Sequence, residues 1–394
     1  MSTVTWIDEL TPGALDVDPY PLYARLRNDA PLSWVPWSDM WFATSWELCA
    51  QIASDSDSFV GAATHPTLDR VFGSPNIVTA SGDVHRDLRR AVDPPLLPRA
   101  VNGYIDEIAR PIAHRHLAAI PDHESVDLMA TYFEPVSVEA LGAVLGLSGV
   151  LPDTLRRWFH ELNIGISNAE RDPAKFVGAD AITAEIESVV DPILDELERS
   201  PDDSALSHML HGGTTVATPR ARTLVYPTLK VILLGGMQEP GHGAASALLG
   251  LLQSGQLQRV VDDQSLVPVA VNEGLRWISP IGVAERMATR DVSIGGVTVA
   301  AGETVEIVLA SANRDEARFD RPDEFDVDRE RVPHMAFGGG EHFCSGHYFS
   351  RKLEQIMLDE LLAAHPNLRL DPADPPIVRG WVFRAPQRLP ATLR

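Results

Sequence analysis

The chain has 394 residues, of which 44% are hydrophobic and 22% charged, and its formal net charge at pH 7 is −22. This composition supplies a large core and argues against general nucleic-acid binding. The two cysteines, Cys49 and Cys344, are too few for a disulfide framework and fit a reducing compartment. The most apolar stretch, 224–237, is too short and too polar to span a bilayer, and the N-terminus lacks the features of a signal peptide. We therefore expect a cytoplasmic protein with no membrane anchor and no nucleic-acid partner.

The first 60 residues predict a helix, a strand pair and a second helix. Leu22 to Leu26 lie in the first helix, and residues 32–43 alternate as two strands around a turn at Ser38-Asp39. Cys49 lies on an expected helix face, where we interpret it as a small buried side chain.

The remainder of the chain predicts a mainly α fold with small β-sheets. Residues 85–275 are mostly helical, residues 291–309 alternate with period two, and helical spacing returns after Cys344. One helix carries an apolar stripe that we expect in the core: Ile182, Ile186, Val189, Val190, Ile193, Leu194 and Leu197. No linker or repeat divides the chain, so we expect a single domain over residues 1–394.

Three groups of charged residues are candidates for binding or structural roles. His85 and Arg89 are four apart and share one helix face, as do Glu273 and Arg276, which are three apart. Arg286 follows an expected loop. Taken singly, each group could equally be a surface ion pair.

Residues 233–242 combine Gly235, Gly236 and Pro240 within a long helical segment. In a helix interior, glycine costs about 1 kcal/mol and proline about 3 kcal/mol relative to alanine. We therefore expect a break in the helix that opens its hydrogen-bond ladder and leaves space for a small molecule against the backbone.

Residues 337–346 place Cys344 in a loop with glycines on both sides, and a helix is expected to follow. Glycines allow the backbone to approach a flat cofactor and direct N–H groups toward the sulfur, and a helix start favours the thiolate. The residues alone leave two interpretations open, a thiolate metal ligand or a buried thiol in a tight turn.

The pattern Phe-x-x-Gly-x-x-x-Cys-x-Gly over 337–346 resembles the haem-binding loop of the cytochrome P-450 family, whose haem ligand is a cysteine thiolate. Further matches follow in the family's order from about residue 20 to the C-terminus. The resemblance implies the family's mainly helical single-domain fold, haem b (iron protoporphyrin IX) with Cys344 as the iron ligand, and dioxygen as a substrate. It also implies that Phe337 packs beside the sulfur and that the haem propionates are held by His85, Arg89, Arg286 and His342.

The resemblance gives Glu273 and Arg276 a structural role, as a pair that fixes the cysteine loop. The family's usual third partner is a cation in a Pro-x-x-Phe segment. Here that segment carries Glu324, so the sequence does not identify the third partner.

On the oxygen side the family carries an acid followed by a threonine, whereas this chain has Gln238 and Glu239 before Pro240. We hypothesise that Glu239, with Gln238, water and the opened backbone at Gly236, delivers the protons that oxygen activation needs. Burial would raise the pKa of the Glu239 carboxyl and keep it protonated. The alternative is that Gln238 and Glu239 only cap a broken helix turn.

The Gln-Glu-Pro variant is similar to the corresponding helix of bacterial family members that demethylate small methoxyaromatics such as guaiacol. That narrower resemblance implies a small pocket, with a free Gly235 amide that binds a phenol oxygen. The implied lining residues are Phe72, Phe159, Val231, Gly235, Val283, Ala284 and Phe383.

The function implied is a haem-thiolate monooxygenase that hydroxylates a small organic substrate, with O-demethylation of a methoxyaromatic to a phenol and formaldehyde as its specific form. Alternatives are a terpenoid or polyketide hydroxylase, a peroxide-driven peroxygenase and a non-catalytic haem sensor.

Electrons would come from a ferredoxin or an iron–sulfur flavoprotein reductase. A basic patch that could steer this partner consists of Arg86, Arg90, Arg99, Arg110, Arg115, Arg351 and Lys352, unless these residues only form solvated helix faces.

Overall fold

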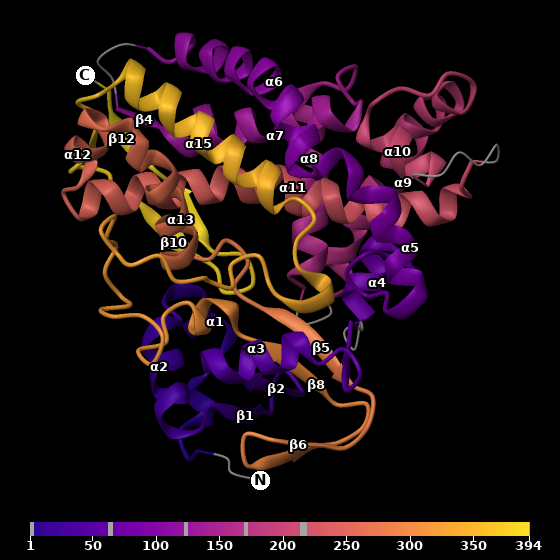
Figure 1. The fold of residues 1–394 in the computed structure, drawn as a ribbon, viewed down its shortest axis with the longest axis vertical. Helices are drawn as coiled ribbons and strands as arrows, with labels where there is room; N and C mark the ends of the chain where they lie inside the picture. Colours follow the sequence, from indigo (N-terminus) through magenta and orange to yellow (C-terminus); the bar gives the residue numbers. More distant parts are fainter. Residues whose placement is uncertain (1–3, 62–65, 122–124, 169–171, 213–218, 394) are drawn as a thin grey trace.

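Helices form most of the computed structural model, which describes residues 4–61, 66–121, 125–168, 172–212 and 219–393 (Figure 1). In chain order the helices are η1 Ile7–Glu9, α1 Pro12–Val17, α2 Tyr20–Asp29, α3 Trp46–Ser54, α4 Pro66–Phe72, α5 Gly82–Val92, η2 Pro94–Leu96, α6 Pro98–Ala118, the π-helix η3 Met129–Phe133, α7 Glu134–Leu145, α8 Pro152–Ile166, α9 Pro173–Arg199, α10 Ala205–His211, α11 Arg222–Gln253, α12 Leu257–Asp262, η4 Gln264–Leu266, α13 Val267–Trp277, α14 Leu309–Ala312, η5 Gly340–His342 and α15 His347–Ala364.

The strands are short and form small sheets. They are β1 Leu32–Val35, β2 Met40–Ala43, β3 Phe59–Val60, β4 Ser125–Asp127, β5 Ala284–Ala288, β6 Val292–Ile294, β7 Val297–Val299, β8 Thr304–Ile307, β9 Arg369–Leu370, β10 Ile377–Arg379, β11 Ala385–Arg388 and β12 Pro390–Thr392. The largest sheet has the order β1-β2-β8-β5-β3, in which only β2 and β8 pair in parallel. The mainly α fold with small β-sheets is thus confirmed, as is the strand pair expected in residues 32–43.

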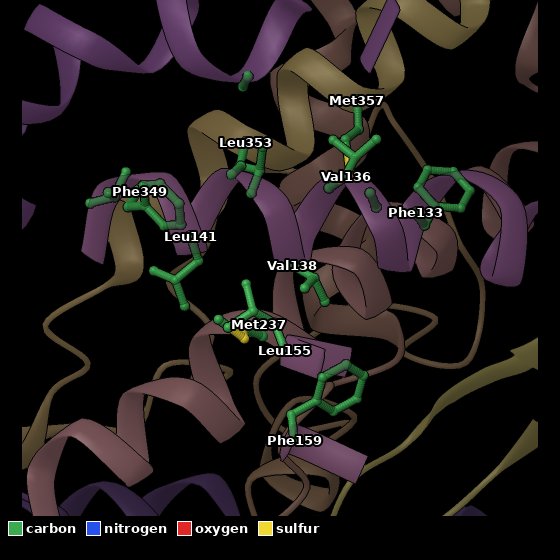
Figure 2. Packing of buried hydrophobic residues seen from close by; sticks show 14 of the residues in the cluster. Phe133, Val136, Val138, Leu141, Leu155, Phe159, Met237, Phe349, Leu353 and Met357 are labelled. Carbon is green, nitrogen blue, oxygen red and sulfur yellow. The ribbon is translucent and has the colours of Figure 1, made fainter. Parts of the chain in front are cut away.

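The helical part packs around α11, which crosses the middle of the molecule and contacts α7, α8, α13 and α15 (Figure 1). Figure 2 shows Leu141, Leu155 and Met237 meeting inside this core. The apolar stripe expected on one helix lies on α9, where Ile182 and Ile186 are buried members. Cys49 is buried on α3, and its thiol donates to the Ala43 carbonyl oxygen at 3.1 Å, which confirms its core role.

Helix α11 is continuous from Arg222 to Gln253, so the predicted helix break is wrong. Pro240 lacks the N–H that would bond the Gly236 carbonyl, but packing sustains the helix past that missing bond. A Cβ added at Gly241 would lie 3.0 Å from the Phe133 carbonyl oxygen, so η3 presses directly against this turn. A continuous helix directs the Gly235 amide to the Val231 carbonyl, and the predicted free amide at Gly235 is therefore not supported.

A buried ion network ties α13 to the segment that leads into the cysteine loop. Arg276 donates to both carboxylate oxygens of Glu273, at 2.8 and 2.7 Å. The third partner, which the sequence left unidentified, is Arg329: its Nε donates to Glu273 at 2.9 Å and its Nη2 to the Glu324 carbonyl at 2.8 Å. Arg276 also donates to the carbonyl oxygens of Asn313, Pro322 and Glu324. These bonds fix the path of the chain toward Cys344.

Replacement of Arg329 tests this network. Arg329→Gln removes one cation from a buried carboxylate, and we expect it to lower the free energy of unfolding by about 3 kcal/mol in urea denaturation. The matched control is Arg259→Gln, because Arg259 pairs with Asp328 at the surface. That change is expected to leave the free energy of unfolding nearly unchanged, because solvent screens the exposed pair. Equal losses in the two variants would contradict a structural role for Arg329.

Candidate active site

A cavity of about 910 Å³ lies between α11, the cysteine loop, α5 and β5. Its wall combines apolar side chains with a few charged ones. Residues lining it include Phe72, His85, Arg89, Val231, Gly235, Gly236, Glu239, Val283, Ala284, Arg286, Phe337, His342, Cys344 and Phe383. Segments more than 250 residues apart in the sequence therefore contribute to one site.

The cysteine loop owes its shape to glycines. Gly338 and Gly340 have positive φ angles of 70° and 65°, which L side chains rarely adopt. A Cβ on Gly340 would also lie 1.8 Å from the Ala53 carbonyl oxygen on α3, so the loop can pack on α3 only with glycine there. Within the loop, the Cys344 amide donates to the Phe337 carbonyl at 3.0 Å. These backbone contacts fix the loop that presents the Cys344 thiol to the cavity.

The Cys344 sulfur lies on the cavity wall. The side chain is open to the cavity, yet desolvation by the surrounding chain raises the pKa of its thiol, and a hydrogen bond with the Gly346 backbone and the charge of Arg89 oppose that shift only in part. A thiolate at this position therefore needs a further positive charge, and a metal ion that binds the sulfur would supply it.

Four cationic or proton-donating groups meet on one side of the cavity. His85 and Arg89 come from α5, Arg286 from β5 and His342 from the cysteine loop. The two imidazole rings lie 4.3 Å apart, and the buried Nε2 atom of each has no hydrogen-bond partner among the described residues. Burial and the neighbouring arginines lower the pKa of His85 to about 4 and of His342 to about 3. Burial also lowers the pKa of Arg286 to about 10. Such a group of converging donors, two of them arginines, fits an anionic ligand.

Across the cavity, α11 presents open space and one carboxyl group. A Cβ added at Gly235 would meet nothing within 4 Å, whereas one at Gly236 would lie 2.7 Å from Leu141. Glu239 is buried, and neither of its oxygens has a hydrogen-bond partner among the described residues. Burial, with the charge of Glu354 added, raises the pKa of Glu239 to about 8. Glu239 is therefore protonated at neutral pH.

Two predicted site residues lie away from the cavity. Gln238 is buried but does not line it, because the next residue along a helix points about 100° away from its neighbour. Phe159 is 1% exposed and packs in the core, with its ring centroid 4.1 Å from that of His160 (Figure 2). Asn163 and Ile166, one and two turns further along α8, line the cavity instead. The prediction that Phe159 lines the substrate pocket is therefore not supported.

The sequence did not reveal a pair of acids in the cavity wall. Glu285 on β5 and Glu306 on β8 are cross-strand neighbours, and both line the cavity. Burial raises the pKa of both carboxyls, that of Glu285 to about 7. Their sequence signal was one glutamate within each of two short strands, and in β5 Arg286 directly follows that glutamate.

The predicted basic patch is largely neutralised. Four of its arginines have carboxylate partners: Arg86 with Asp83, Arg90 with Asp87, Arg110 with Asp106 and Glu360, and Arg115 with Glu139. Arg351 is half-buried, with its guanidinium 4.7 Å from the Phe337 ring centroid. The interpretation as solvated helix faces is therefore favoured over a steering patch.

Comparison with known proteins identifies the family. The family model described as Cytochrome P450 matches residues 259–376. Nocardicin C N-oxygenase of Nocardia uniformis subsp. tsuyamanensis is 31% identical over 405 residues, which cover 97% of this chain and 96% of that protein. The chain belongs to the cytochrome P450 family. Another relative, 6-deoxyerythronolide B hydroxylase of Saccharopolyspora erythraea, is 28% identical and is covered in full by 99% of this chain. The crystal structure of a myxobacterial cytochrome P450 in complex with myristic acid superposes with a TM-score of 0.87 at 25% identity, covering 99% of this chain and 100% of that one.

The residues present fit the haem b that cytochromes P450 hold through a cysteine thiolate. Cys344 supplies the sulfur from one wall of the cavity. His85, Arg89, Arg286 and His342 line the same cavity and would donate to the two propionates. The Nε2 atoms of the two histidines have no other partner among the described residues, whereas Arg89 also pairs with Asp93 and Arg286 also donates to the Glu285 carbonyl. When bound, haem would supply the chemistry by which one atom of dioxygen is inserted into a substrate with two electrons from a redox partner. The chain is accordingly a monooxygenase. Among its described helices, none has the length and apolar character required to cross a membrane.

The raised pKa of Glu239 makes stability depend on pH. Between pH 4.5 and pH 8 the carboxyl is ionised in the unfolded chain but protonated in the folded one, so folding stability falls as pH rises through this window. Glu239→Gln removes this loss. We expect the unfolding free energy of the variant to exceed that of the wild type, and this difference to grow by on the order of 2 kcal/mol from pH 6 to pH 8. The exposed Glu107→Gln serves as control, and a gain that does not grow with pH would contradict the buried, protonated acid.

Proposed function

We propose that the chain O-demethylates a small methoxyaromatic compound. Oxygen insertion converts a methyl C–H bond to C–OH, and the resulting hemiacetal breaks its methyl C–O bond to give a phenol and formaldehyde. Dioxygen supplies the inserted atom, its second atom leaves as water, and the reaction consumes two electrons and two protons. The electrons come from the redox partner.

The observation that carries this proposal is the small apolar space beside α11. The haem must occupy much of the 910 Å³ cavity, so the volume left for a substrate is limited. Gly235 leaves that space open on one side, and Val231, Val283 and Ala284 make its walls apolar. Phe72 and Phe383 add aromatic rings, which favour a flat aromatic ligand.

Glu239 is our candidate for the group that supplies protons to the oxygen side. Its carboxyl lines the cavity and is protonated at neutral pH because burial raises its pKa. A carboxyl with both oxygens unpaired can turn toward a water or a ligand without breaking a bond to the protein. Gly236 is a supporting position, because its carbonyl receives no bond from Pro240. Gln238 does not line the cavity, so we assign it no part in proton delivery.

A second candidate is hydroxylation of a larger apolar molecule. The cavity continues beyond β5 to Pro12, Trp37 and Arg379, which gives a long substrate a route past the haem site. Relatives include a steroid C26-monooxygenase of Mycolicibacterium smegmatis and the structure with myristic acid. The two candidates differ in ligand length and are therefore separable by binding.

Electron supply and context complete the proposal. We propose that a ferredoxin or an iron–sulfur flavoprotein reductase delivers electrons on the sulfur side of the haem, where α15 begins. We further propose that the protein acts in the cytoplasm as one domain over residues 1–394.

Ligand binding to the haem-loaded protein tests the substrate class. We expect guaiacol and related small methoxyaromatics to shift the haem spin state at micromolar concentration and to yield formaldehyde with a matched reductase. Myristate and steroids are expected to bind weakly. Spin shifts confined to the long ligands would favour the second candidate and overturn O-demethylation.

Gly235→Ala tests the position of the small substrate. The new methyl group would enter open space beside the ligand, so we expect guaiacol affinity to fall about tenfold, or about 1.4 kcal/mol. The control is Gly103→Ala on the exposed face of α6, where a Cβ also meets nothing within 4 Å. Unchanged guaiacol affinity in Gly235→Ala would place the ligand elsewhere in the cavity.

A further inference from the structure

We propose that His242 relays protons to Glu239 from a solvent-reaching cluster formed by Glu134, His160 and Arg156. The relay lies on the side of α11 that faces α7 and α8. The inference rests on the proposed role of Glu239 and adds the route by which that acid regains its proton.

The inner end of the relay is one turn of α11. His242 follows Glu239 by three residues, and its Nδ1 lies 3.9 Å from the Glu239 Oε2. The side chains are enclosed, with Glu239 9% and His242 8% exposed. The His242 Nδ1 and both Glu239 oxygens have no hydrogen-bond partner among the described residues. A separation of 3.9 Å is too long for a hydrogen bond, but a small side-chain rotation or one bridging water would close it.

The outer end is the start of α7. A Cβ added at Gly241 would lie 3.4 Å from the Glu134 amide nitrogen, so the turn that carries His242 packs directly on Glu134. The Glu134 carboxylate accepts from Arg156 at 2.6 Å and lies 3.2 Å from the His160 Nε2. The side chain of His160 is 53% exposed, whereas that of Glu134 is 15% exposed. The cluster therefore reaches from solvent to the backbone on which this turn packs, and the charge of Glu134 acts on His242.

The protonation states of Glu239 and His242 allow a proton to pass between them without leaving a net charge buried on α11. Burial lowers the pKa of His242 to about 4, with Glu134 opposing and His160 adding to the shift. At neutral pH a neutral imidazole thus stands beside a protonated Glu239. A neutral imidazole has one donor and one acceptor nitrogen. After Glu239 gives its proton to the oxygen side, the His242 Nδ1–H can restore it while Nε2 takes a proton that bulk water supplies through the exposed His160 and the Glu134 carboxylate, so the count balances.

Glu354 on α15 offers a competing route. Its carboxyl lies against the next turn, 2.8 Å from a Cβ added at Gly243, and its charge acts on Glu239. Ser350 donates to the Glu354 Oε1 at 2.6 Å, and burial raises the pKa of Glu354 to about 8. Glu354 therefore belongs in the test as a matched buried acid.

The test is hydrogen–deuterium exchange of the Glu239 carboxyl, followed by infrared spectroscopy on resting, haem-loaded protein. The difference between wild type and Glu239→Gln assigns the carbonyl band of the protonated acid. We expect that band to exchange at least tenfold more slowly in His242→Phe and His242→Gln, because neither side chain accepts and releases a proton in turn. Glu354→Gln is expected to exchange at the wild-type rate. Wild-type rates in both His242 variants, or slowing only in Glu354→Gln, would overturn the relay.

Turnover separates failure of the relay from failure of the proposed function. With an intact relay and a working Glu239, both Glu239→Gln and His242→Gln lower the formaldehyde formed per electron consumed. If Glu239→Gln leaves that yield unchanged, Glu239 is not the proton donor. The relay to Glu239 would then still be judged by the exchange rates. His242→Gln retains a polar side chain of similar reach, so its melting temperature checks that slow exchange is not a folding defect.

Discussion

Charge balance around the cavity is the constraint on which the rest of the site depends. His85, Arg89, Arg286 and His342 lie together, and the carboxylates beside them are Glu341, 3.6 Å from the His342 Nε2, and Asp93, which pairs with Arg89. Cys344 lies in the same wall as a thiol whose pKa is raised by desolvation. The charged form of each of these groups, taken alone, is unfavourable in an enclosed cavity. An iron porphyrin with two propionates balances all of them at once, since the metal favours the thiolate and the carboxylates pair with the donors.

The scaffold holds these groups through contacts that have no part in the chemistry. The Glu273–Arg276–Arg329 network fixes the chain before the cysteine loop, and Gly340 lets that loop press on α3. On the opposite wall, the packing of Gly241 against η3 keeps α11 helical past Pro240. Glu239 is thereby held in a place where its carboxyl is buried without a partner. Such a position costs stability, as is common for groups retained for function.

Sequence reasoning succeeded where the signal was local. The glycines around Cys344, the four-residue spacing of His85 and Arg89, and the alternation in residues 32–43 each determine their own geometry. The predictions failed where contacts between segments distant in the sequence determine the local structure. The helix break predicted at Pro240 does not occur, because η3 supports that turn, and Phe159 lies in the core because of the depth at which α8 sits. Arg329 completes the ion network from five residues beyond the position where the family pattern placed a cation, so spacing alone could not identify it.

The most direct test of the account is the spectrum of the reduced, carbon monoxide-bound protein in wild type, Cys344→Ser and the control Cys49→Ser. We expect the thiolate-type Soret band in wild type and in Cys49→Ser, and its loss in Cys344→Ser. A thiolate band that persists without the Cys344 sulfur, or purified wild-type protein that binds no haem, would contradict it.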